Sequence, residues 1–176
     1  MRFPSSVLIL AGALAMTGCS SMVSLNPFVT DKDAVSDPAL AGVWSGDNGN
    51  SIYAIRQDGT SYTITYMEKS SQAAKFQARL VKAGDAELLD LVSTNEDAFQ
   101  IPVHTMVRVW PAGNSLRIAF LDSDWLKQNA AQHLATTTAD DRLLITASGE
   151  AVRSFLMKFG TDEKAYSQPD LLERVQ

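Results

Sequence analysis

One residue in this chain is placed by its neighbours for a covalent reaction. Cys19 is the only cysteine among 176 residues, so the chain cannot form an internal disulfide. It follows a basic start, an apolar run over residues 7–16 and two small residues, Thr17 and Gly18. The run is too short to cross a bilayer, which takes about 20 apolar residues. This order predicts a secretory signal peptide over residues 1–18, cut beside the cysteine.

The segment Met16-Thr17-Gly18-Cys19 resembles the lipobox of bacterial lipoproteins, which usually opens with Leu at the position of Met16. The resemblance implies that the Cys19 thiol takes a diacylglyceryl group and that the new amino terminus receives a fatty acid such as palmitate. Because each buried methylene contributes about 0.8 kcal/mol, several acyl chains hold a protein on a membrane. In that family an Asp after the cysteine retains many proteins at the inner membrane, whereas this chain has Ser20. We therefore expect an anchor on Cys19 at the periplasmic face of the cell outer membrane.

The two histidines are the next candidates for chemistry. His104 shares a predicted strand face with Arg108 and Trp110, where we expect it to bond to a neighbour in the wall rather than to catalyse. His133 lies near the end of a predicted helix, where positive charge is favoured, and is interpreted as structural. Residues 122–124 resemble the start of a calcium loop, but the required Gly and closing Glu are missing, so helix capping explains them. The sequence predicts no metal site.

Catalytic motifs are missing from the sequence as well. It contains no Gly-x-Ser-x-Gly turn for a serine nucleophile, and the Gly-containing residues 46–49 lack the lysine and the following helix of a phosphate-binding loop. The acidic pairs Glu96-Asp97 and Asp140-Asp141 lie in predicted loops, where they are expected to be solvated. We therefore predict that the protein is not an enzyme and uses no cofactor.

Alternating apolar and polar residues predict the elements that position these side chains. Asp58-Gly59 between two alternating segments is a strong hairpin signal. Helical spacing predicts helices around residues 125–134, capped by Asp122 or Ser123, and 148–160, capped by Ser148, with a last helical turn from Pro169. Eight strands are predicted over residues 42–45, 51–56, 60–67, 75–81, 87–92, 103–110, 116–121 and 143–146.

These elements predict a mainly β fold, with about eight antiparallel strands in an up-and-down barrel or strongly curled sheet and two late helices. Gly42-Val43-Trp44 resembles the Gly-x-Trp opening of lipocalins and related calycins. In that family the tryptophan closes one end of the barrel beside a basic residue of a late strand, and Arg142 is the expected partner here. The chain departs from the family in two respects: it lacks the second lipocalin motif, Thr-Asp-Tyr, and a predicted helix precedes its last strand.

Aromatic residues on the predicted strands are the candidate ligand-binding residues. An eight-stranded barrel is either filled by side chains or holds one small ligand. The aromatic side chains would form an apolar pocket with polar tips for an acyl chain or another lipophile, or they would simply fill the core, and the sequence leaves both readings open. The candidates are Tyr53, Tyr62, Tyr66, Phe76, Trp110 and Phe120.

Charge and composition divide the chain and limit its partners. The whole chain carries −5, and because residues 1–18 hold one arginine and no acid, the remainder carries −6, which argues against nucleic acid as a partner. Residues 19–39, with Pro27 and Pro38, are predicted to be the acylated cysteine and a flexible tether. Residues 40–176 are predicted to be a single lipocalin-like domain.

These features predict a lipid-anchored envelope protein whose barrel binds an apolar small molecule or lipid without catalysis. The alternative is an envelope assembly or interaction protein with a filled barrel, which binds another protein through its late helices around Trp125 or Phe155.

Overall fold

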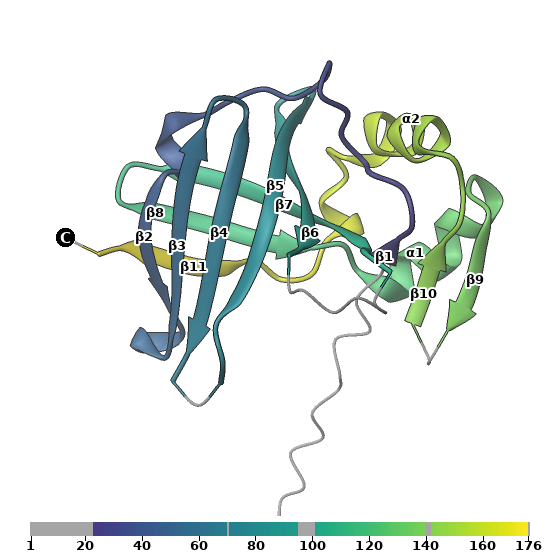
Figure 1. The fold of residues 1–176 in the computed structure, drawn as a ribbon. Helices are drawn as coiled ribbons and strands as arrows, with labels where there is room; N and C mark the ends of the chain where they lie inside the picture. Colours follow the sequence, from purple (N-terminus) through teal and green to yellow (C-terminus); the bar gives the residue numbers. More distant parts are fainter. Residues whose placement is uncertain (1–22, 70, 95–100, 140–141, 176) are drawn as a thin grey trace, which may run out of the picture.

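The computed structural model describes residues 23–69, 71–94, 101–139 and 142–175. Within them eight antiparallel strands close into a barrel, which confirms the predicted mainly β fold (Figure 1). The closure is made by β6 and β7, which pair from Glu87–Val109 to Val92–His104. In order around the barrel, the strands are β6 (Ala86–Ser93), β5 (Ala74–Ala83), β4 (Ser61–Glu68), β3 (Ser51–Asp58), β2 (Gly42–Gly46), β11 (Asp170–Arg174), β8 (Ser115–Phe120) and β7 (His104–Ala112).

Tight turns join most neighbouring strands of the barrel. The predicted hairpin at Asp58-Gly59 connects β3 to β4, and Gly59 adopts φ of +61° there. Gly84 and Gly113 take the same left-handed conformation in the β5–β6 and β7–β8 turns, where a side chain would be strained. A short 3₁₀ turn, η2 (Asp47–Gly49), connects β2 to β3. Turn chemistry therefore sets the register of these hairpins.

The last strand of the barrel differs from the prediction. Residues 170–174 form β11, which pairs with β8 and β2, although a helical turn is predicted there. The predicted eighth strand exists as β10 (Arg142–Ile145), but it lies outside the barrel between β1 (Val23–Ser24) and β9 (Thr136–Ala139). A stretch of five residues with two adjacent leucines fits the period of a helix as well as that of a strand. Here the long-range pairing with β8 and β2 makes it a strand.

The chain between β8 and β11 packs against the outside of the barrel (Figure 1). It holds the two predicted helices, α1 (Ser123–Asn129) and α2 (Gly149–Phe159), capped by Asp122 and Ser148. It also holds β9, β10 and the short turns η3 (Ala130–Gln132) and η4 (Glu163–Ala165). Among the described residues, no helix is both long and apolar enough to span a membrane.

Two hydrophobic cores share the wall formed by β5 to β8. Alternate residues point inward and outward along a strand, so Leu89 and Val107 belong to the core inside the barrel, whereas Leu88 and Met106 belong to the core under the helices. This wall therefore lies between the two hydrophobic cores, and its strands bury apolar side chains on both faces.

The segment predicted to be a flexible tether is packed against the barrel from residue 23 onward. Phe28 and Val29 are buried in the outer core, and the backbone of Val35 bridges to Leu80 of β5. The short turn η1 (Pro38–Leu40) then closes one barrel end. We call residues 23–41 the strap. The prediction of a tether over 19–39 is thus wrong for residues 23–39, because the few apolar side chains there are buried without any regular period.

Candidate functional site

The inside of the barrel is hollow over part of its length. The cavity measures about 350 Å³ and is lined by inward-facing side chains from every barrel strand except β2. Its walls are aliphatic and aromatic, and the only polar groups that the lining side chains bring are the hydroxyls of Tyr53, Tyr66 and Thr105. The lining residues are Tyr53, Ile55, Ile64, Tyr66, Phe76, Leu89, Leu91, Thr105, Val107, Val109, Leu116, Ile118, Phe120 and Leu172.

One end of the barrel is closed by large buried side chains. Trp44 is fully buried, and its indole Nε1 donates a 3.0 Å hydrogen bond to the carbonyl oxygen of Leu40 in η1. Tyr62 is also fully buried, and its hydroxyl accepts from the backbone N–H of Asp37 at 2.6 Å. Leu40 itself is buried beneath the strap. We call this the closed end.

The basic partner of Trp44 is Arg174, not the predicted Arg142. The Arg174 guanidinium lies 4.1 Å from the Trp44 ring centre and donates to the carbonyl oxygens of Ala41 and Ala39, both at 2.9 Å. Arg142 lies on β10, which is not a barrel strand. The expected contact between a basic side chain and the tryptophan is therefore present, but the basic residue lies on β11, for which the sequence predicts a helical turn. Gly42 is needed beside it, because its φ is +148° and a Cβ there would collide with the Arg174 side chain.

The other end of the barrel, which we call the mouth, carries the aromatic lining residues. The rings of Tyr53 and Tyr66 lie 4.9 Å apart, and Phe120 is 40% exposed at the end of β8. Desolvation by burial, with the neighbouring Tyr66 second, raises the pKa of Tyr53 to about 12. Both phenols therefore stay neutral hydroxyls at physiological pH.

Carboxylates adjoin the mouth on one side. A second hollow of about 340 Å³ shares Tyr53, Tyr66 and Leu172 with the cavity and is also lined by Asp47, Glu68 and Asp170. Among the residues that line these two hollows, none is a lysine, arginine or histidine. The approach to the cavity is thus acidic on the side of β2, β3, β4 and β11.

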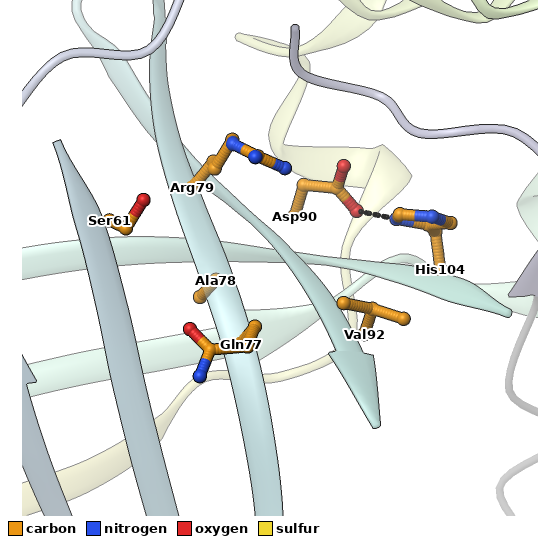
Figure 2. Close-up of a pocket in the computed structure, with 7 residues that line it drawn as sticks. All are labelled: Ser61, Gln77, Ala78, Arg79, Asp90, Val92 and His104. Atoms are coloured by element: carbon orange, nitrogen blue, oxygen red, sulfur yellow. Dashed lines mark hydrogen bonds and ion pairs between the residues drawn. The ribbon is translucent and has the colours of Figure 1, made fainter. Parts of the chain in front are cut away.

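A third feature lies on the outer wall, where Asp90 and His104 point toward each other (Figure 2). Asp90 is 4% exposed, and its Oδ1 lies 2.9 Å from His104 Nδ1. Its Oδ2 accepts from the backbone N–H groups of Phe28 at 2.9 Å and Val29 at 3.2 Å. Ser61 and Arg79 lie further along the same wall (Figure 2). Asp90 therefore fastens the strap to the barrel, and His104 has the wall contact expected from the sequence.

The structure distributes the six predicted aromatic residues over three places. Tyr53, Tyr66, Phe76 and Phe120 line the cavity. Tyr62 lies at the closed end, whereas Trp110 faces outward between the guanidinium groups of Arg108 and Arg117, at 4.6 and 5.2 Å. Sequence reasoning missed the aliphatic lining, such as Leu91 and Ile118, because it considered aromatic side chains only. The alternation of Val107 and Val109 with Trp110 is the signal that separates the two faces.

Trp125 and Phe155, around which a protein-binding surface is predicted, pack against each other. Trp125 of α1 packs on Phe155 and Phe159 of α2, with ring centres 6.1 and 5.5 Å apart. Phe155 is buried in the outer core, whereas Trp125 and Phe159 are half-buried. Cys19 lies outside the described residues. No cluster of three or more metal-ligating side chains occurs in the part of the chain that the structure describes.

Comparison of the chain with protein-family models, curated proteins and solved structures found no match in any of the three.

Proposed function

We propose that this chain is a lipid-anchored envelope protein whose lipocalin-like barrel carries a small lipophile, with no catalytic step. The observation that carries the proposal is the apolar cavity of about 350 Å³. This volume lies near the lower end of the roughly 300–1,000 Å³ range of small-molecule pockets. The size favours a single acyl chain or a compact ligand over a lipid with several chains.

The closed end supports the resemblance to lipocalins and calycins. Trp44 closes the barrel beside a basic side chain of the last strand, Arg174, and Gly42 gives that side chain room. This is the arrangement that the resemblance implies for the Gly-x-Trp opening. A barrel filled at one end and hollow at the other has a single entrance, which suits a carrier.

Charge at the mouth favours a neutral or cationic ligand. The cavity wall carries no charged side chain among its described residues, and Asp47, Glu68 and Asp170 lie beside the entrance. A fatty-acid carboxylate there would meet like charges, whereas an alcohol or amine would meet phenol hydroxyls and carboxylates that accept its hydrogen bonds. We therefore expect a long-chain alcohol or amine to bind more tightly than the matching acid.

Fluorescence of N-phenyl-1-naphthylamine with the domain lacking residues 1–18 tests the cavity. Val107→Trp fills the lumen from β7 and should weaken probe binding at least tenfold, whereas Thr65→Trp adds the same side chain to the outer face of β4 and should leave it unchanged. Dodecanol and dodecylamine should displace the probe at lower concentrations than dodecanoate. Equal binding by the two variants would refute the carrier proposal.

Two further measurements separate the carrier from the alternative. Native mass spectrometry of the gently purified protein should show a lipid-sized mass, whereas a bare domain that co-purifies with an envelope protein would favour an assembly role. For the anchor, Cys19→Ser should abolish labelling by a radioactive or clickable palmitate and release the protein from the outer-membrane fraction. Continued labelling would contradict the proposed attachment.

A further inference from the structure

The strap enters the fold at the mouth and leaves it at the closed end. Ser24 of β1 pairs with His104, which stands one residue before the cavity-lining Thr105 on β7. From there the chain passes the Asp90 carboxylate and reaches Tyr62 at Asp37. Figure 1 shows the same path as the dark trace that leaves β1 and crosses to the opposite end of the barrel. Residues before Val23 are therefore joined to the mouth end.

Covalent geometry limits how far Cys19 can lie from that point. Four peptide links separate Cys19 from Val23, and fully extended they span about 14 Å. The strand β3, with 8 residues, runs roughly 26 Å along its axis, which after the usual tilt gives a barrel roughly 20 Å high. The segment between an anchor on Cys19 and Val23 is thus shorter than the barrel is high, even when it is fully extended.

Exposed apolar side chains lie near the same end. Leu25 follows β1 and is 39% exposed, Ile101 precedes β7 and is 73% exposed, and Phe120 ends β8 at 40% exposed. Strands β8, β7 and β1 are neighbours in the sheet, so these residues belong to adjoining strand ends. The carboxylates of Asp47 and Glu68 lie beside β2, β3 and β4, across the mouth. Among the described residues, the side nearest the anchor therefore exposes these three apolar side chains, and the carboxylates that line the second hollow lie on the other side.

We propose that the Cys19 anchor holds the barrel with its mouth against the membrane surface, so that a lipophile passes between the bilayer and the cavity without crossing water. The inference rests on the acylation of Cys19 in the proposed function. It commits the apolar side of the mouth to a lipid surface, because exposed apolar side chains gain free energy by entering the interface and the strand beside them, β1, begins within about 14 Å of the acylated residue.

Depth-dependent quenching of the acylated full chain in vesicles tests this orientation. The vesicles contain phosphatidylethanolamine and phosphatidylglycerol at 3:1 with a nitroxide-labelled phospholipid. Since acylated Cys19 has no free thiol, Ile101→Cys or Asp58→Cys supplies the only site for a bimane label. Both positions are exposed, the first near the mouth and the second in the β3–β4 turn at the closed end. We expect at least threefold stronger quenching at residue 101 than at residue 58.

A lengthened strap provides the second variant. Ten Gly/Ser residues inserted between Met22 and Val23 add up to about 36 Å of reach and should reduce quenching at residue 101 at least twofold while acylation is kept. Equal quenching at the two labels, or stronger quenching at residue 58, would overturn the inference alone. Mass spectrometry that finds no acyl group on Cys19 would overturn it together with the proposed anchor.

Discussion

Among the contacts that hold the strap, the buried Asp90 carboxylate is the one whose removal should loosen the strap most. It accepts hydrogen bonds from the backbone N–H groups of Phe28 and Val29 and bonds to His104. Asp90 is buried, with 4% of the residue exposed. Replacing it by alanine leaves two buried backbone donors without an acceptor. Asp90→Asn keeps one oxygen acceptor but loses the charge.

The cost follows from these contacts. Each buried donor left unsatisfied costs about 1–3 kcal/mol, and removal of one partner of a buried charged network costs about 3–5 kcal/mol. We expect Asp90→Ala to lower the free energy of unfolding by about 3–5 kcal/mol and Asp90→Asn by about 1–2 kcal/mol. A single domain of this size has about 5–15 kcal/mol in total, so the alanine variant is expected to be close to unfolding.

Urea unfolding of the domain lacking residues 1–18, followed by tryptophan fluorescence, measures these values. Asp31→Asn is the matched control on the same strap, because Asp31 pairs with Arg79 at 2.7 Å while its side chain is 84% exposed, and it should cost less than about 1 kcal/mol. Hydrogen exchange at the amides of residues 28 and 29 should be faster in Asp90→Asn than in the unmodified domain, and it should be unchanged in Asp31→Asn. Equal destabilisation by Asp90→Asn and Asp31→Asn, with unchanged exchange, would show that Asp90 does not hold the strap.

Three further outcomes follow from the barrel ends and the buried phenols. Arg174→Gln should lower the urea midpoint through a loss of about 2–3 kcal/mol, since it removes the cation over Trp44 and its bonds to backbone carbonyls; an unchanged midpoint would disprove this. Gly42→Ala should cost about 2–3 kcal/mol for the strained φ of +148° at the start of β2, and a neutral effect would contradict this. Burial raises the pKa of Tyr53 and of Tyr166, a buried residue of the outer core, to about 12, whereas unfolded phenols ionise near about 10. The contribution of the two neutral phenols to the free energy of unfolding is therefore complete below about pH 10 and is lost as the pH rises through about 12. Absorbance at 295 nm checks this, and two phenols that titrate near pH 10 in the folded protein would contradict it.

Local pattern accounts for most of the barrel. The strands β2 to β8 were predictable because their apolar residues alternate and their turns carry Gly at positions of positive φ, such as Gly59. The helix starts were predictable from Asp122 and Ser148, whose side chains cap α1 and α2. In each case one short stretch of sequence contains the whole signal.

The errors fall where distant segments decide the structure. The strand β11 is set by pairing with β8 and β2 rather than by its own five residues, and the basic partner of Trp44 was misassigned with it. The strap reads as a linker because its backbone is satisfied by isolated contacts, such as Val35 with Leu80 and Phe28 with Asp90. None of these contacts has a period along the sequence.

The barrel is filled by side chains at one end and hollow at the other. Trp44 and Tyr62 point inward near one end, where their volume and the turn η1 close the lumen. Toward the mouth the inward positions hold aliphatic and aromatic residues such as Leu91 and Tyr66, which line a cavity of about 350 Å³ without filling it. Both readings of the aromatic residues therefore describe part of the same barrel. Since depth along the axis depends on the register of every strand, the alternation within one strand cannot tell a plug residue from a pocket residue.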